Sequence, residues 1–103
     1  MNQEQVTVIA YIEVKPGSEE TFLEEIPALV AATRAEAACI NYDFHRSDEK
    51  PNLFMFYENW MSMAGLKEHA RSAHIQTYRN NISDLLAKPT EIKTYKMVTQ
   101  LVA

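Results

Sequence analysis

The amino-acid sequence predicts one α+β domain in which four antiparallel strands form a sheet and helices pack on one face of it. The 103 residues are enough for one hydrophobic core and too few for two, so the domain is expected to span residues 1–103. Apolar residues make up 47% of the chain, the usual share of a globular protein. Strand patterns occur in four segments, two of them with apolar side chains at every second position, and a helical period occurs between them.

The first strand is predicted over residues 5–14, where apolar side chains occupy every second position. A Lys-Pro-Gly turn at 15–17 follows, and Ser18 stands where a helix N-cap belongs. The helix is expected to kink at Pro27, which lacks a backbone donor, and to end near 35–38. Its apolar stripe consists of Phe22, Ile26, Leu29, Val30 and Thr33.

Two further strands, over residues 40–46 and 53–60, read as a hairpin because the segment 47–52 between them is polar and contains a proline. The second of these strands begins Leu-Phe-Met-Phe-Tyr and is therefore apolar on both faces. Each face of the sheet must then be covered. We expect helices on one face and a second subunit on the other.

Helical periodicity starts after Ser62, pauses near Ser72 and resumes, which predicts a short helix followed by a longer one. A last alternating segment, 92–98, follows a Lys-Pro pair. The resulting order is that of the ferredoxin-like βαββαβ fold, a four-stranded antiparallel sheet with both helical layers on one face. Because the other face carries aromatic side chains, the sequence predicts a homodimer that buries it.

Charge and composition exclude several classes of function. Ten Lys and Arg against 14 Asp and Glu give a net charge of −4, and no segment concentrates positive charge, so no nucleic-acid partner is expected. No apolar run approaches the roughly 18 residues of a membrane span, so no membrane association is expected. The single cysteine, Cys39, fits a reducing compartment and a cytoplasmic location, and it is expected to be a packing residue because no basic neighbour activates it.

The candidate site lies between residues 57 and 78, which hold the one tryptophan and two of the three histidines. Histidine transfers protons near neutral pH and aromatic rings enclose flat ligands, so this segment can supply a small-molecule pocket. The alternative is that these residues have no functional role, with the tryptophan in the hydrophobic core and the histidines on the helix surface. The candidate residues are Tyr57, Glu58, Asn59, Trp60, His69, His74 and Tyr78.

The sequence predicts no metal site and no cofactor. His69 and His74 are five residues apart, so on one continuous helix they diverge by about 140° and could share an ion only if the chain breaks near Ser72. Cofactor phosphates usually sit in glycine-rich loops, and the chain has only Gly17 and Gly65.

The run NYDFHRSDEKPNLFMFYENW, with the helical pattern after it, resembles the antibiotic biosynthesis monooxygenase family, including quinol monooxygenase-like proteins. The pattern is a tyrosine strand, a turn with Asp and Pro, a Glu-x-Trp strand end, and Leu-x-x-His-x-x-Ser-x-His on the next helix. The matching residues are Tyr42, Asp48, Pro51, Glu58, Trp60, Leu66, His69, Ser72 and His74. One departure is Ala38, which stands where the family usually has glycine.

The resemblance implies a dimeric α/β barrel and a cofactor-independent monooxygenase that oxidises a quinol, anthrone or other polyphenol with dioxygen. In that case His74, which the sequence slightly favours, or His69 is the base that removes a phenolic proton. Trp60 would form a flat wall against the substrate ring, and Tyr78 would hydrogen-bond a substrate oxygen.

Other activities occur in this superfamily, so two alternatives stay open: a non-oxidative small-molecule isomerase and a non-catalytic ligand-binding dimer. Haem-degrading relatives use a strand-one asparagine, a helix tryptophan and a histidine ligand. This chain has Ile9 and Tyr11 in the first strand, His69 in place of that tryptophan, and Arg79 near the ligand position. Haem degradation is therefore not expected.

Overall fold

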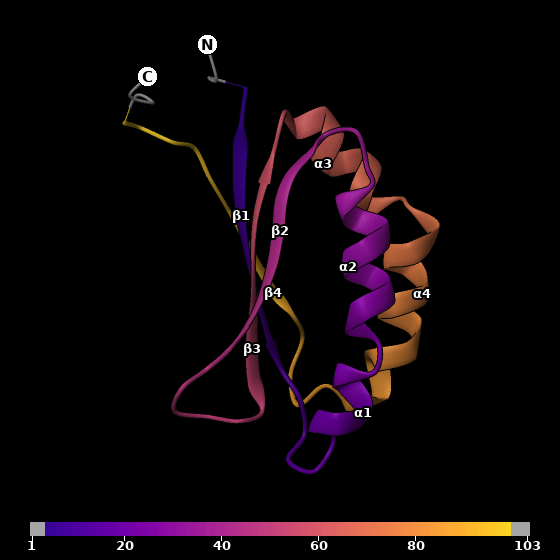
Figure 1. Ribbon diagram of the computed structural model, residues 1–103. Helices are drawn as coiled ribbons and strands as arrows, with labels where there is room; N and C mark the ends of the chain where they lie inside the picture. The colour runs from indigo at the N-terminus through magenta and orange to yellow at the C-terminus, as the bar shows by residue number, and fades with distance from the viewer. Residues whose placement is uncertain (1–3, 100–103) are drawn as a thin grey trace.

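The computed structural model describes residues 4–99, and its elements follow the predicted order (Figure 1). The strands are β1 (Val6–Glu13), β2 (Cys39–Arg46), β3 (Leu53–Trp60) and β4 (Glu91–Tyr95). The helices are α1 (Glu19–Leu23), α2 (Ile26–Arg34), α3 (Met63–Ala70) and α4 (Ala73–Ile82), followed by the 3-10 turn η1 (Ser83–Leu85). Within these residues, no helix is long and apolar enough to cross a membrane. The ends of the predicted domain, 1–3 and 100–103, lie outside the described residues.

The four strands form one antiparallel sheet in the order β2-β3-β1-β4. All the helices lie on the same face of this sheet, so the molecule has two layers (Figure 1). This is the ferredoxin-like α+β arrangement, and the predicted fold class is confirmed. The alternation in β1 sends Val6, Val8, Ala10, Ile12 towards the helices, and the burial of these side chains alternates accordingly.

Aromatic rings fill the layer between sheet and helices. Phe22 of α1 packs against Phe54 of β3 with ring centroids 4.9 Å apart, and Tyr42 of β2 stacks on Phe56 at 4.7 Å. Each of these four side chains is at most 2% exposed. Offset and tilted ring pairs of this kind add to the free energy of burial. They fix the distance between β2, β3 and the helical layer, and so the space available for a site.

The first helical segment differs from the single kinked helix that the sequence predicts. It consists of two helices, α1 and α2, and Pro27 lies in the first turn of α2. A proline in that position gives up only a backbone donor that has no helical partner, whereas inside one long helix it would remove a hydrogen bond. The chain therefore breaks at Glu24 and Glu25 and restarts.

Several strand boundaries also differ from the predicted ones, most of them by one residue: β1 spans Val6–Glu13 rather than 5–14, and β4 starts at Glu91 rather than at 92. The last strand ends at Tyr95, which pairs with Thr7, rather than at Val98. The ladder ends there because β1 begins at Val6 and offers little backbone beyond it. At the other edge, β2 starts at Cys39, one residue earlier than predicted, and its register with β3 shifts between Cys39 and Asn41.

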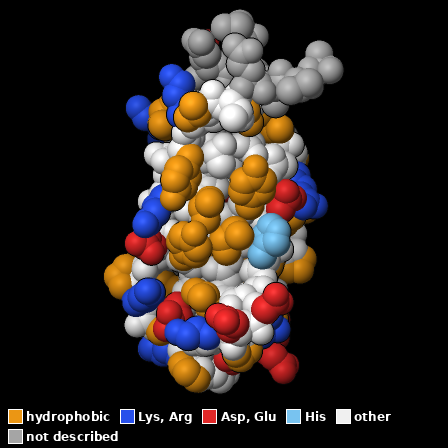
Figure 2. All heavy atoms as spheres, turned by 90° about the vertical axis from the view of Figure 1, so that its left-hand side faces the viewer, with side chains coloured by type: hydrophobic (Ala, Val, Ile, Leu, Met, Phe, Trp, Pro, Cys, Tyr) orange, Lys and Arg blue, Asp and Glu red, His pale blue; other side chains and the backbone are white. Residues whose placement is uncertain are grey.

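The sheet face away from the helices is not covered by any described part of the chain. Figure 2 looks onto this face and shows a group of apolar side chains at its centre, with charged side chains around them. The strand register assigns to this face, among others, Ile9, Tyr11, Met55, Tyr57 and Tyr95. Tyr57 on the inner strand β3 and Tyr95 at the end of the edge strand β4 are 40% and 49% exposed, so large aromatic side chains on this face are open to solvent.

Gly65 brings α3 close to the chain just before β2, which sets where the helix crosses the end of the sheet. A Cβ atom at this position would overlap the Cβ atom of Ala38. We expect Gly65→Ala to lower the free energy of unfolding by about 1–3 kcal/mol, the usual cost of overpacking. Urea denaturation measures this change.

The matched control is the double variant Ala38→Gly and Gly65→Ala, which moves the methyl group from one side of the contact to the other. It should recover most of the loss. Full stability of Gly65→Ala alone would contradict the close approach.

Candidate functional site

A cavity of about 430 Å³ lies between the sheet and the helices α3 and α4. We call it the inner cavity. Apolar side chains form most of its wall, and a small number of polar groups reach it, which is the usual composition of a small-molecule site. Its lining includes Val8, Ala10, Tyr42, Phe56, Glu58, Leu66, Lys67, His69, Ile75, Tyr78, Arg79, Ile82, Leu86 and Ile92. Of the seven residues predicted for the site, Glu58, His69 and Tyr78 belong to this lining.

His69 lies on the last turn of α3 and is 5% exposed. Its Nδ1 atom is 2.7 Å from Oε2 of Glu36, and its ring packs against Trp60 with centroids 4.7 Å apart. Because a carboxylate oxygen only accepts hydrogen bonds, the proton of the neutral ring sits on Nδ1 and the lone pair is on Nε2. Burial lowers the pKa of His69, while the contact with Glu36 acts in the opposite direction. The ring is therefore neutral near pH 7 and able to accept a proton.

His74 contacts the same carboxylate but does not line the inner cavity. Its Nε2 atom is also 2.7 Å from Oε2 of Glu36. The two histidines meet because the helix breaks between them: Ser72 accepts a hydrogen bond from the backbone of Ile75 and starts α4 in a new direction. The structure thus places His69 at the cavity and His74 behind it, although the sequence slightly favoured His74 as the base.

Glu36 is the site residue that the sequence analysis missed. It lies between α2 and β2 and accepts hydrogen bonds from two histidines that are 33 and 38 positions further along the chain. No local pattern marks such a residue, since its partners come from a distant helix corner. The one indication available in the sequence was the pair of histidines itself, which needs an acceptor when buried.

Glu36, His69 and His74 also form the described cluster that could bind a metal ion, with ligand atoms within 4.8 Å of one another. Both nitrogens, however, lie 2.7 Å from one oxygen atom. Ligands on a tetrahedral zinc ion with bonds of roughly 2.1 Å are about 3.4 Å apart. The observed distances are those of hydrogen bonds, so protons link these three groups in this arrangement, and the absence of a metal stays a prediction.

Glu58 is a buried carboxyl group in the wall of the inner cavity, 4% exposed. The indole nitrogen Nε1 of Trp60 donates a 2.9 Å hydrogen bond to its Oε1 atom. Burial raises the pKa of Glu58 to about 7, and the bond from Trp60 only partly offsets this. Glu58 can therefore exchange a proton near neutral pH. Trp60 itself is fully buried behind the wall, so it positions Glu58 and His69 and has no face in the cavity.

Tyr78 of α4 belongs to the lining of the cavity. Among the described residues, its hydroxyl group is buried and has no hydrogen-bond partner. Burial raises the pKa of Tyr78, so the group stays protonated and is available as a donor. A buried polar atom without a partner costs free energy, which a ligand oxygen in the cavity would recover.

Tyr57 and Asn59 do not join the other candidates. Alternation along β3 puts both on the sheet face away from the helices, which we call the open sheet face and which lies opposite the inner cavity. There Asn59 accepts a hydrogen bond from Thr7 and donates one to Asn41. The expectation that all seven residues share one pocket overlooked this alternation.

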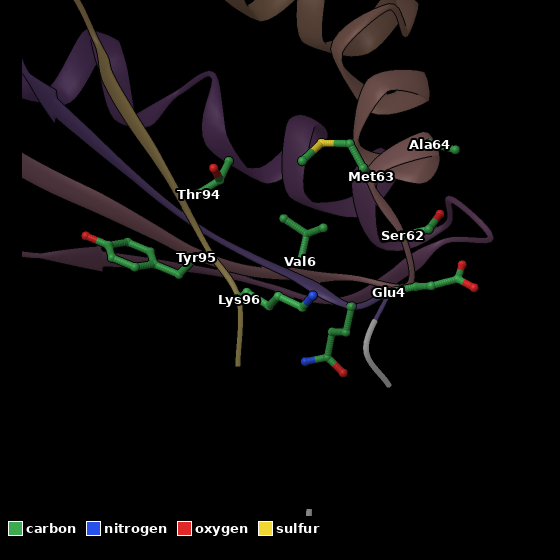
Figure 3. Close-up of a pocket in the computed structure, with 9 residues that line it drawn as sticks. Glu4, Val6, Ser62, Met63, Ala64, Thr94, Tyr95 and Lys96 are labelled. Carbon is green, nitrogen blue, oxygen red and sulfur yellow. The ribbon is translucent and has the colours of Figure 1, made fainter. Parts of the chain in front are cut away.

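A second, more open hollow of about 580 Å³ lies where β1 and β4 meet the start of α3 (Figure 3). Its sides include Glu4, Val6, Ser62, Tyr95 and Lys96, and of all its lining residues only Val6 is buried. It contains no buried titratable group. The lining of the inner cavity, by contrast, includes the buried residues Glu58, His69 and Tyr78.

Cys39 is half-buried at the start of β2. Burial, together with the nearby Glu36, raises the pKa of its thiol to about 11. A thiol that stays protonated at neutral pH is a poor nucleophile. This agrees with the predicted packing role.

Comparison with known proteins gives one consistent result. The sequence profile described as "Antibiotic biosynthesis monooxygenase" matches residues 5–81. The "Uncharacterized protein sll1783" of Synechocystis is 35% identical over 89% of this chain, which spans 63% of that relative's length. The "Putative monooxygenase YcnE" of Bacillus subtilis is 34% identical over 84% of this chain and 92% of its own. The crystal structure of PA3566 from Pseudomonas aeruginosa superposes with a TM-score of 0.88 at 31% identity, covering 96% of this chain and 99% of that one.

Proposed function

This chain belongs to the antibiotic biosynthesis monooxygenase family, and we propose that it oxidises a quinol, anthrone or other polyphenol with dioxygen and without a cofactor. The observation that carries the proposal is a buried, neutral histidine at the wall of an apolar cavity, with its lone pair on Nε2. Such a site can deprotonate a phenol and exclude water from the resulting anion.

The substrate supplies the electrons in this reaction. His69 accepts a proton at Nε2, and the electron-rich anion then transfers one electron to dioxygen. The resulting radical and superoxide combine to form a carbon–oxygen bond, and the O–O bond breaks as water leaves. Overall the substrate loses two hydrogen atoms and gains one oxygen atom, while the second atom of dioxygen ends in water. Tyr78 and protonated Glu58 donate hydrogen bonds to the substrate oxygens in this proposal.

Oxygen uptake tests the proposed activity. We expect the chelator-treated protein to consume dioxygen with at least one quinol or anthrone of a panel, above the autoxidation rate measured without protein. Equal rates with and without protein across the panel would contradict it. Conversion of a ligand under anaerobic conditions would instead identify an isomerase, and saturable binding without conversion a ligand-binding protein.

A homodimer completes the proposal. The open face, with Tyr57 and Tyr95 at 40% and 49% exposure, offers the apolar area that a second copy would bury. We expect light scattering at micromolar concentration to give twice the chain mass of 11.8 kDa. Tyr57→Glu combined with Tyr95→Glu should give the monomer mass, whereas Gln76→Glu, on the exposed side of α4, should not. A monomer mass for the unaltered protein would contradict the dimer.

A further inference from the structure

Two cationic residues lie at the mouth of the inner cavity, and the first is Arg79 on α4. Lys67 of α3 lies on the same lining, and both side chains are exposed. Among the described residues, neither forms an ion pair with a carboxylate. The chain as a whole carries a net charge of −4, so a positive cavity mouth runs against its overall charge.

The other arginines are engaged elsewhere. Arg34 pairs with Asp43 at 3.0 Å and Arg71 with Glu68 at 2.7 Å. Arg46 donates a 2.8 Å hydrogen bond to the carbonyl of Pro51 and lies over the ring of Phe54. Within residues 4–99, the one hydrogen bond of the Arg79 side chain is a 3.5 Å contact from Nη1 to the carbonyl of Ala70, another residue of the cavity lining. Its guanidinium group therefore sits at the cavity with most of its donors free.

The charge of Arg79 also acts inside the cavity. Burial raises the pKa of Tyr78, and the nearby Arg79 charge acts in the opposite direction. Burial lowers the pKa of His69, and the Arg79 charge adds to that effect. The guanidinium group is thus close enough to influence both groups that would contact the substrate oxygen.

We propose that the inner cavity takes an aromatic substrate that carries a carboxylate besides its phenolic hydroxyl, with the hydroxyl at His69 and Tyr78 and the carboxylate on Arg79 at the mouth. This inference rests on the proposed function and names its substrate class. Arg79 offers the planar donor fork that matches a carboxylate, and Lys67 adds a second positive charge. The apolar walls between the two ends accommodate the rings.

A matched pair of ligands tests the proposal by calorimetry, without turnover. The probes are 6-hydroxy-2-naphthoic acid and its methyl ester, which carry the hydroxyl and the carboxyl group at opposite ends of the same ring system and differ only in the charge of the carboxyl end. We expect the acid to bind at least about 10-fold more tightly than the ester, the size of one charge-assisted hydrogen bond. In Arg79→Met this preference should fall to about 2-fold or less while the affinity for the ester is unchanged. Arg71→Met, whose side chain pairs with Glu68 outside the cavity, should keep the full preference.

Equal affinities of acid and ester for the unaltered protein would overturn the proposal, as would a preference that survives in the double variant Lys67→Met and Arg79→Met. Absence of binding by either probe at millimolar concentration would also overturn it. The outcome is separable from that of the proposed function: a preference for the acid without oxygen uptake would refute the monooxygenase and leave this inference intact. Oxygen uptake that is equally fast with neutral and acidic quinols would support the monooxygenase and refute the preference for a carboxylate.

Discussion

His69→Ala is expected to lower kcat/KM for quinol oxidation by about 100-fold or more, the usual contribution of a general base. The substitution removes the Nε2 lone pair from the cavity wall. Oxygen-electrode kinetics measure the loss. His45→Ala, an exposed histidine that the strand register puts on the open sheet face, should retain normal rates.

Because His69 is buried, its removal also affects packing, and imidazole in the buffer separates the two effects. Exogenous imidazole should restore part of the activity of His69→Ala if the ring acts as a base. A loss that imidazole does not restore, and that follows the loss in thermal stability, would show that His69 is structural.

Glu36 is expected to act through His69 as a positioning residue, and its pH profile distinguishes this role from a packing role. The Glu36 contact raises the pKa of His69 against the effect of burial. Glu36→Gln should therefore lower kcat and move the acidic limb of the rate profile to lower pH, because His69 then loses its proton at a lower pH. An unchanged acidic limb would contradict the assignment.

Glu58→Gln is expected to be more stable than the unaltered protein at pH 8 and no more stable at pH 4.5. The pKa of Glu58 rises from 4.5 to about 7, mainly through burial, so the folded state holds this proton more tightly than the unfolded state between those values. Stability therefore falls as pH rises through this window, by up to about 3 kcal/mol. Glutamine cannot ionise, and its carbonyl can still accept the hydrogen bond from Trp60.

Urea denaturation at pH 4.5, 6 and 8, at one protein concentration, measures the difference between the two proteins. The lowered pKa of His69 makes the free energy of unfolding rise with pH, which is the opposite trend. This contribution is the same in both proteins and cancels in the difference between them. Glu68→Gln, whose side chain is exposed, should show no such trend. A stability difference that is constant across pH would mean that Glu58 does not titrate near neutrality.

Much of the fold was predictable from local patterns. Alternation marked β1, a run of apolar residues marked β3, and serines at 62 and 72 marked the starts of α3 and α4, where both side chains accept the capping hydrogen bonds. Pro27 correctly marked where the helical segment is interrupted, but it begins a new helix instead of kinking one. Which of the two happens depends on how the preceding helix can pack. The end of β4 was not predictable from its own residues, since its partner strand sets it.

The candidate site was predictable only in part, for a similar reason. Of the residues proposed from the sequence, His69, Glu58 and Tyr78 line the inner cavity. The sequence-based candidates also included Tyr57 and Asn59, although successive side chains of a strand point to opposite faces, which puts these two on the face away from Glu58. Glu36 and Arg79 acquire their roles from contacts across the fold, which composition and spacing do not encode.

The hydrogen bonds that converge on Glu36 also have a kinetic consequence. They join a connecting segment to a helix corner 33 and 38 positions away, whereas the helices and the β2–β3 hairpin form from neighbouring residues. During refolding, the tautomer that leaves Nε2 of His69 free is therefore fixed only when these distant parts dock. We expect helical circular dichroism to recover before enzymatic activity does. Native-state hydrogen exchange should likewise show that this corner opens more readily than the centre of the sheet, so that the activity responds to partial unfolding before the overall structure is lost.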